Sequence, residues 1–109
     1  MPHLRLYAVS EAVAETLSEK LIPELAQLTQ TQTDEFTLQV VQGQFYRAGQ
    51  RCEGNPQVEV IWFDRGLHVQ NQCAKAITNA LLPYYSETNI QVAFCVLAQK
   101  QYYINGAHF

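Results

Sequence analysis

Apolar and polar residues alternate at the start of the chain, which predicts a β-strand over residues 3–9. Leu4, Leu6 and Ala8 share one side of that strand, and more polar side chains occupy the other. Ser10 is a good helix N-cap, and from there apolar residues recur every three or four positions. They predict a long helix with one apolar stripe: Val13, Leu17, Leu21, Leu25 and Leu28.

The middle of the chain predicts two further strands separated by a loop. Residues 36–41 form the second strand, and Phe45–Tyr46 resume a short extended piece. Residues 48–56 contain two glycines, an asparagine and a proline, so we expect a loop there. Residues 57–63 are apolar on both faces, which predicts a strand that is covered on both sides.

A second helix and a fourth major strand complete the pattern. Asp64 is placed to cap a helix that begins near Arg65 and stops at Pro83. Its stripe consists of Val69, Cys73, Ala76, Ile77, Ala80 and Leu81. Residues 90–97 are nearly all apolar and form the fourth strand, and a tail over residues 98–109 follows.

The order strand, helix, strand therefore occurs twice, with the two helices about 55 residues apart. This predicts a single α/β (α+β) domain over residues 1–109, built from two βαβ units. The two strands within each unit should be parallel, because a helical crossover connects them. Both helices should cover one face of a four-stranded sheet.

Composition limits the classes of molecule that the protein is expected to bind. The chain has 109 residues and a net charge of −3, so it offers little attraction to nucleic acid. No apolar run has the length of a membrane span, and the N-terminus does not resemble a secretory signal. Three widely spaced cysteines, Cys52, Cys73 and Cys95, do not form a disulfide framework, which favours reduced thiols in the cytoplasm.

The dipeptide Met1-Pro2 is a candidate for chemistry. Removal of Met1 by methionine aminopeptidase would leave a secondary amine at the head of the first strand. A free backbone amine has a pKa near ~8, and burial lowers the pKa of such a cation. The amine would then suit general-base catalysis near neutral pH. Many chains begin with Met-Pro for no chemical reason, so the dipeptide alone does not decide the matter.

Two folds fit the order of elements: the ferredoxin-like βαββαβ sandwich and the tautomerase fold. The second resemblance is the more specific. Met1-Pro2 opens the chain, residues 36–41 resemble the second strand of that family, and residues 105–109 resemble the end of macrophage migration inhibitory factor. The chain is thus similar to the superfamily of 4-oxalocrotonate tautomerase (4-OT) and macrophage migration inhibitory factor. Residues 2–5, 58–66 and 102–109 resemble a small bacterial branch of it.

The resemblance implies a homotrimer with a pocket at each subunit boundary. Pro2 would be the general base of a keto–enol tautomerase, an isomerase acting on a small-molecule acid. The chain departs from the pattern at the family's substrate-holding groups. Thr31 stands near the position of a lysine, and Gln91 and Ala93 align with a tyrosine and an asparagine. Thr37 and Gln39 stand where the arginines of 4-OT would be sought.

Other polar residues have a functional and a structural interpretation. Arg65 begins the second helix, where it would hold a substrate carboxylate or form an ion pair with Asp64 or Glu59. Tyr102 and Tyr103 would donate hydrogen bonds to an enolate or pack the tail onto a neighbouring subunit. Glu59 lies in an apolar strand, and we expect it to pair with Arg5 or, less often, to act as a catalytic acid. Trp62 and Phe63 read as core or interface residues.

No cofactor or metal is expected. The three histidines lack the local spacing of a metal site, and no phosphate-binding glycine loop or nucleophile motif occurs. Cys73 and Cys95 read as small core residues. The leading hypothesis is a tautomerase-like enzyme; the alternatives are a non-catalytic trimeric ligand-binding or scaffold protein of the same fold, and a dimeric ferredoxin-like regulatory module.

Overall fold

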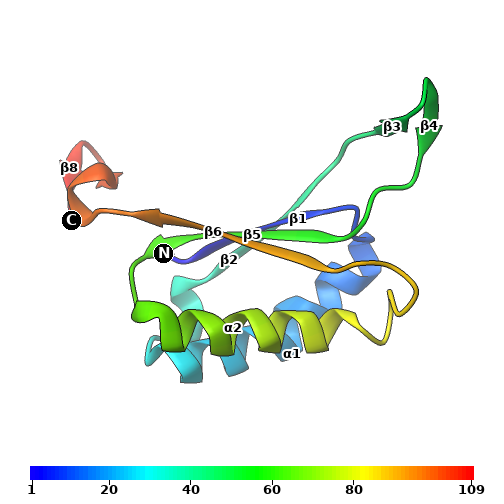
Figure 1. The fold of residues 1–109 in the computed structure, drawn as a ribbon. Helices are drawn as coiled ribbons and strands as arrows, with labels where there is room; N and C mark the ends of the chain where they lie inside the picture. The colour runs from blue at the N-terminus through cyan, green and yellow to red at the C-terminus, as the bar shows by residue number, and fades with distance from the viewer.

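The protein is a four-stranded sheet with two long helices on one face, as the computed structural model of residues 1–109 shows (Figure 1). The sheet has the order β2-β1-β5-β6. Its strands are β1 (His3–Tyr7), β2 (Thr37–Val41), β5 (Gln57–Phe63) and β6 (Gln91–Leu97). The helices are α1 (Glu11–Thr29) and α2 (Gly66–Leu81). The fold class and this placement of the helices confirm the prediction from sequence.

Each helix connects two parallel neighbours, β1 with β2 and β5 with β6, while β1 and β5 pair antiparallel at the centre. The two βαβ units therefore lie side by side. In a ferredoxin-like split unit, a strand from elsewhere separates the two parallel strands. Here each strand lies next to the strand that follows its own helix, so the ferredoxin-like alternative is wrong.

The core lies between the sheet and the helices. Alternate residues of β1 and β5, among them Leu4, Leu6, Val58 and Val60, point to the helices and are buried. Trp62 continues that row, is 2% exposed and packs on Phe94 with ring centroids 4.9 Å apart. The helices contribute most of the predicted stripes, namely Leu17, Leu21, Leu25, Cys73, Ala76, Ile77 and Leu81.

The opposite face of the sheet, which we call the open face, has no covering layer within the chain. The strand register places three rows of four residues across it; two of them are Thr37-His3-Ile61-Cys95 and Gln39-Arg5-Glu59-Ala93. The side chains of Gln57, Glu59, Ile61 and Phe63 are only half-buried. The prediction that β5 is covered on both sides is therefore wrong for the single chain, because no second layer of helices exists.

A hairpin projects beyond one end of the sheet, on the side away from the helices (Figure 1). It consists of β3 (Phe45–Arg47) and β4 (Gln50–Cys52), joined by Ala48 and Gly49 with φ of 52° and 79°. The extended piece at Phe45–Tyr46 is confirmed. The predicted loop over residues 48–56 is partly wrong, because its glycine provides the positive φ of a tight turn and lets the chain return as a strand.

The C-terminal tail lies at the other end, beside the N-terminus (Figure 1). A 3-10 turn over Gln99–Gln101 leads into a small hairpin of β7 (Tyr103–Ile104) and β8 (Ala107–His108). Asn105 and Gly106 form its turn with φ of 53° and 85°. The N–H of Phe109 donates to the carbonyl of Tyr102 at 3.1 Å, so the end of the tail folds back on its beginning.

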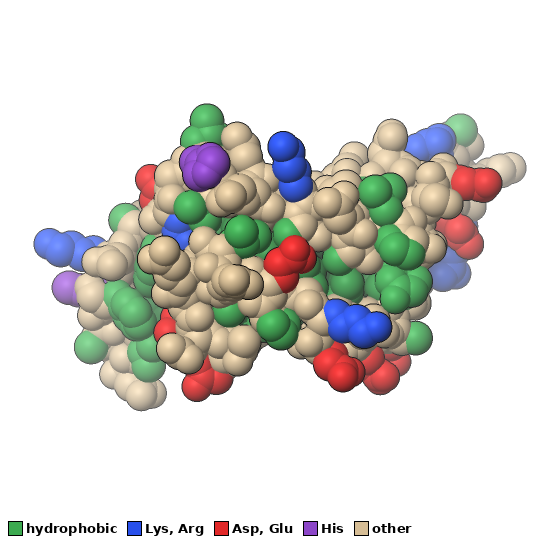
Figure 2. Space-filling view, turned by 90° about the horizontal axis from the view of Figure 1, so that it is seen from below, with side chains coloured by type: hydrophobic (Ala, Val, Ile, Leu, Met, Phe, Trp, Pro, Cys, Tyr) green, Lys and Arg blue, Asp and Glu red, His purple; other side chains and the backbone are tan.

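The helix-covered face carries charged side chains of both signs with apolar side chains between them (Figure 2). Neither helix has the combination of length and apolar character that crossing a membrane requires. This face is an ordinary solvated surface, whereas the open face combines a few polar contacts with half-buried apolar residues.

Candidate active site

Pro2 lies immediately before β1, and its ring is almost completely buried, with less than 2% of its surface exposed. Its carbonyl accepts a hydrogen bond from the N–H of Thr37 at 3.1 Å, which extends the ladder between β1 and β2 by one residue. Alternation along the strand turns the ring toward the helices, on the side of Leu4. The position of the ring is therefore fixed by backbone pairing and by core packing together.

A hollow of about 290 Å³ adjoins this end of β1. Met1 lines it, so the peptide bond that joins Met1 to Pro2 lies at its edge. Polar groups from three parts of the chain surround it: His3 and Arg5 of β1, the segment of Glu35 and Thr37 that enters β2 from a 3-10 turn, and Tyr102 of the tail. The complete lining is Met1, His3, Arg5, Glu35, Thr37, Ile61 and Tyr102.

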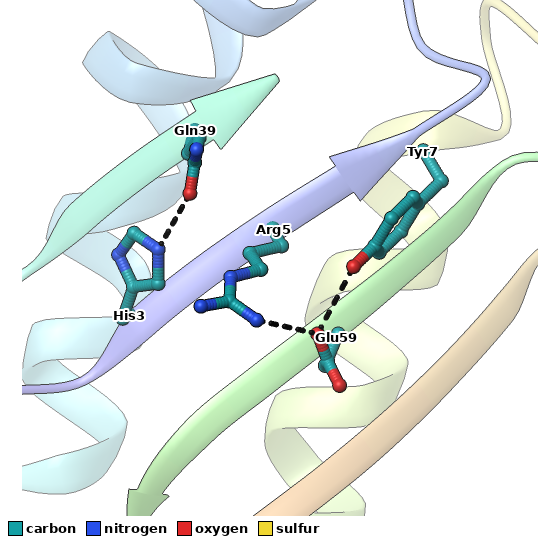
Figure 3. Close-up of polar contacts among 5 residues, drawn as sticks. All are labelled: His3, Arg5, Tyr7, Gln39 and Glu59. Atoms are coloured by element: carbon teal, nitrogen blue, oxygen red, sulfur yellow. Dashed lines mark hydrogen bonds and ion pairs between the residues drawn. The ribbon is translucent and has the colours of Figure 1, made fainter. Parts of the chain in front are cut away.

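His3 contacts two residues of β2, of which Figure 3 shows Gln39. Its Nδ1 contacts the hydroxyl of Thr37, and its Nε2 lies 3.0 Å from Oε1 of Gln39, the geometry of an N–H donating to an amide oxygen. Both ring nitrogens therefore have partners within the chain. Parallel pairing makes this possible, because His3 and Thr37 are direct neighbours in the register.

Arg5, Glu59 and Tyr7 form a second polar group one row further along the open face (Figure 3). Nη1 of Arg5 lies 3.5 Å from Oε1 of Glu59, and the hydroxyl of Tyr7 donates to the same oxygen at 3.2 Å. This is the only ion pair in the chain, and Arg5 and Glu59 are direct partners in the antiparallel register. The predicted pairing of Glu59 with Arg5 is confirmed.

The two tyrosines of the tail occupy different positions. Tyr102 lines the hollow and packs against Phe63 and Phe109, with ring centroids 5.7 and 5.4 Å away. Tyr103 is 58% exposed and its nearest aromatic neighbour is His108, 5.7 Å away. The structure thus places Tyr102 in the hollow that Met1 also lines, and it places Tyr103 on the outer hairpin, away from the hollow.

Arg65 lies at the N-cap of α2 and does not line the hollow. Its guanidinium carbon lies 5.6 Å from the centre of the Trp62 ring, on the side of the sheet that the helices cover. The expected ion pair with Asp64 or Glu59 is absent: Asp64 instead accepts a hydrogen bond from the N–H of Gly66 at 2.9 Å. The cation–π contact with Trp62 takes the place of that pair.

The three thiols are unpaired and differ in exposure. Cys73 is buried in the core as predicted, and burial raises the pKa of its thiol, with a smaller opposing effect from Arg65. Cys95 is exposed, so its assignment to the core is wrong. The reason is that β6 is an outer strand and Cys95 points to the open face, which sequence alternation does not distinguish from the core face.

A larger hollow, about 790 Å³, lies at the opposite end of the sheet beneath the β3–β4 hairpin. Arg51, Glu53, Tyr85 and Thr88 supply much of its polar lining. Tyr85 accepts a hydrogen bond from the N–H of Ser10 at 3.0 Å and so ties the loop after α2 to the start of α1. Pro2 is at the other end of β1, so the chemistry proposed from sequence belongs to the smaller hollow.

Sequence analysis proposed Pro2 and Tyr102 as site residues and did not propose His3 and Arg5, which line the same hollow as Tyr102. Alternation had placed both on one side of the first strand, and Arg5 had been assigned to Glu59. The missing information was which residues of other strands and of the tail face them. A parallel partner at Thr37 and a tail that returns to the N-terminus are properties of the tertiary fold.

Comparison with known proteins identifies the family. The chain matches the domain of unknown function DUF1904 over residues 1–108. It belongs to the DUF1904 family. The crystal structure of a DUF1904 domain from Sebaldella termitidis is 27% identical, covers 100% of both chains and superposes with a TM-score of 0.93. A protein of unknown function from Vibrio cholerae is 34% identical over 99% of this chain and 87% of its own, with a TM-score of 0.88.

More distant structures establish the fold. The asymmetric trimer of a fused 4-OT matches with a TM-score of 0.79 and 9% identity, over 97% of this chain and 94% of its own. Structures of macrophage migration inhibitory factor homologues match in the same way. These likenesses show that this DUF1904 protein has the tautomerase fold expected from its sequence. No curated protein matches the chain.

Proposed function

We propose that this DUF1904 protein is a keto–enol tautomerase, an isomerase that uses the nitrogen of Pro2 as its general base on a small keto or enol acid. The observation that carries the proposal is that Met1 lines the hollow beside the buried Pro2 ring. Removal of Met1 would enlarge that hollow and turn the amide nitrogen of Pro2, at the edge of the hollow, into a basic secondary amine. The named tautomerase among the fold relatives, fused 4-OT, supports the same chemistry.

In the proposed reaction, the amine takes a proton from the carbon next to the substrate carbonyl and the carbonyl oxygen becomes an enolate. Returning the proton to that oxygen completes the enol, and the reverse order regenerates the ketone. The Tyr102 hydroxyl lines the hollow and is the proposed hydrogen-bond donor to the enolate oxygen. Arg65 and Tyr103 do not line the hollow of their own chain, so as substrate-binding residues they would act from a neighbouring protomer.

We also propose a homotrimer, assembled through the open face. The solved fused 4-OT is a trimer. Ile61 and Phe63 are half-buried on this face of the single chain, and Ala93 and Cys95 are exposed there. A second layer of protein would bury this apolar area, and association of this kind is common for small domains. The three unpaired cysteines agree with the cytoplasmic location expected from sequence.

Thiol alkylation tests whether the protomers associate through the open face of the sheet. In the trimer, we expect Cys95 to react with iodoacetamide as slowly as buried Cys73, whose raised pKa keeps it in the unreactive thiol form. Dilution to concentrations at which the trimer dissociates should restore reaction at Cys95 and leave Cys73 unreactive, as peptide mass spectrometry at each cysteine will show. If sedimentation shows a trimer and Cys95 still reacts like an exposed thiol, the protomers associate through another surface. If sedimentation shows a monomer at all concentrations, the proposed trimer is refuted.

A second function is favoured by one observation. Gln91 and Ala93 stand on the open face where the superfamily has a tyrosine and an asparagine, and Thr31 replaces a lysine. A protein that kept the fold and the hollow without these groups would bind a small acid at the trimer interface without converting it. This non-catalytic binding or scaffold function predicts a bound ligand and no turnover with any member of a keto-acid panel.

One pair of proteins separates the two functions. The first carries its purification tag at the C-terminus, and intact-mass measurement checks that Met1 is absent. The second has an N-terminal extension that keeps the nitrogen of Pro2 in a peptide bond. Turnover of phenylpyruvate by the first and none by the second supports the tautomerase. Equal rates, or no turnover by the processed protein on any keto acid, overturn it.

A further inference from the structure

The larger hollow, beneath the β3–β4 hairpin, has the size of a small-molecule site. Its volume of about 790 Å³ lies within the range of roughly 300–1,000 Å³ that ligand pockets occupy. None of its lining residues belongs to the four strands of the main sheet. Assembly through the open face of that sheet, as proposed above, therefore does not use the side chains that line this hollow.

This hollow lies at the carboxyl ends of the parallel strands β1 and β2. Ala8 and Ser10 follow β1, and Gly43 and Gln44 follow β2. In open sheets with helical crossovers, ligands are commonly bound at this end, because the helix after a strand directs its N-terminal N–H groups there. Ser10 is the N-cap of the 19-residue helix α1. The hollow at Pro2 adjoins the amino ends of the same strands, so the two hollows are separate.

Three polar side chains that line the hollow keep unused hydrogen-bond donors. The hydroxyl oxygen of Tyr85 accepts from the N–H of Ser10 at 3.0 Å, but its own proton has no acceptor within the chain. Oγ of Ser10 likewise accepts from the N–H of Val13 at 3.2 Å and leaves its proton free. The guanidinium of Arg51 belongs to no ion pair. Two hydroxyl donors and a cation in one hollow favour a ligand that carries a carboxylate.

A carboxylate in the same hollow limits the class of ligand further. Glu53 lies two residues after Arg51, and the two side chains form no ion pair with each other. Glu53 would repel a phosphate or a second carboxylate on the ligand, and it would attract an ammonium group. The two charges of the lining therefore suit a zwitterion, which presents one group of each sign.

An aromatic ring gives the hollow an apolar wall. The ring of Phe45 lies directly against the backbone at Gly54, where an added Cβ would be 2.6 Å from ring atoms. Only glycine permits this contact, because the ring would otherwise have to move. Phe45 is 37% exposed, so part of its ring is open to a ligand in the hollow. Ala8 and Pro56 add further apolar surface to the lining.

We propose that the hollow beneath the β3–β4 hairpin binds a free α-amino acid with an apolar or aromatic side chain. The carboxylate of the ligand binds Arg51 and the hydroxyl groups of Ser10 and Tyr85. The ammonium group of the ligand binds Glu53, and its side chain packs against Phe45. This site is separate from the proposed tautomerase site and does not depend on it.

Amide chemical shifts locate the binding. The full-length protein, labelled with ¹⁵N, is titrated with L-phenylalanine, L-leucine and glycine. The first two should bind more tightly than glycine, because they have side chains for the apolar wall. We expect the largest shifts at Gly43, Gly54 and Thr88, which line this hollow, and none at His3 and Thr37, which line the hollow at Pro2. Shifts confined to the second pair, or no shifts with any of the three, overturn the proposal.

Two substitutions of exposed residues test the charged partners. Arg51→Met is expected to raise the dissociation constant for L-phenylalanine by about 10- to 100-fold, the effect of losing a charge-assisted hydrogen bond. Glu53→Gln should raise it by about 10-fold. Arg47→Met and Glu15→Gln remove the same charges outside the hollow and should bind as the unaltered protein does. Calorimetric titration measures all four, and equal constants for Arg51→Met and Arg47→Met overturn the proposal.

Two analogues of L-phenylalanine test whether the ligand is a zwitterion. 3-Phenylpropionate lacks the ammonium group, and 2-phenylethylamine lacks the carboxylate. Each should bind at least about 10-fold more weakly than L-phenylalanine. Glu53→Gln should not weaken 3-phenylpropionate further, because that ligand has no group for Glu53. If 3-phenylpropionate binds as tightly as L-phenylalanine, the ligand is a simple acid and the proposal is overturned. Pro2 takes no part in these measurements, so they stand whether or not the protein is a tautomerase.

Discussion

Pro2→Ala is expected to lower kcat/KM for phenylpyruvate by about 10²- to 10⁴-fold, the usual contribution of a general base. Removal of Met1 from this variant leaves the primary amine of alanine, so the charge of the terminus is kept. What is lost is the secondary amine and the buried ring that fixes its direction. Because the ring of Pro2 is less than 2% exposed, the shorter side chain also leaves space beneath the nitrogen. Initial rates of enol formation by both proteins check the prediction.

Pro23→Ala is the matched control for that substitution. Pro23 lies within α1 on its exposed side, away from the hollow, so the rate should not change. Intact-mass spectra of all three proteins are needed, because an uncleaved Met1 would imitate the loss of the base. A Pro2→Ala protein that lacks Met1 and retains the full rate would contradict the assignment of Pro2.

Trp62→Ala is expected to reduce the free energy of unfolding by about 3–5 kcal/mol, the range for truncating a large buried aromatic side chain. Trp62 is 2% exposed, packs on Phe94 across the β5–β6 pair and carries Arg65 over its ring. Its removal leaves a cavity between the sheet and the helices that neighbouring side chains cannot fill without moving. Urea unfolding followed by far-UV circular dichroism measures the change.

Tyr46→Ala provides the comparison for Trp62→Ala. Tyr46 is also a large aromatic, but it lies on the β3–β4 hairpin and is 67% exposed. Its truncation should change stability by less than about 0.5 kcal/mol. The unfolding curves must be recorded at several protein concentrations, since an oligomer is stabilised by mass action. A Trp62→Ala loss no greater than that of Tyr46→Ala would contradict the core described for this fold.

The major elements were predictable because their patterns are local. Alternation over β1 and a stripe of one residue in three or four over α1 and α2 depend only on neighbouring residues. The pairing of Arg5 with Glu59 was also predictable, since a carboxylate in an apolar strand needs a nearby cation. What sequence left open was the face on which each outer-strand residue lies, which is why Cys95 was assigned to the core.

The residues that line the hollow were less predictable than the position of Pro2 beside it. The dipeptide Met1-Pro2 is recognisable in the sequence itself. Several of the groups around it come from β2, β5 and the tail, which are distant in sequence. Arg65 was a reasonable anchor by its place at a helix start, yet the turn after β5 directs it over Trp62, on the helix side of the sheet. The two sides of a sheet are distinguished only once every strand has its neighbours.

The outer strand β6 has a consequence for the single chain in solution. Its seven residues, Gln91–Leu97, contain no charged residue and no proline, and the order of the sheet leaves one of its edges unpaired. Uncharged strand edges of this kind recruit further strands and begin aggregation. If the proposed trimer forms, a variant that weakens it will therefore precipitate sooner than persist as a stable single chain. Low solubility of such a variant would then report on association and not on a damaged core.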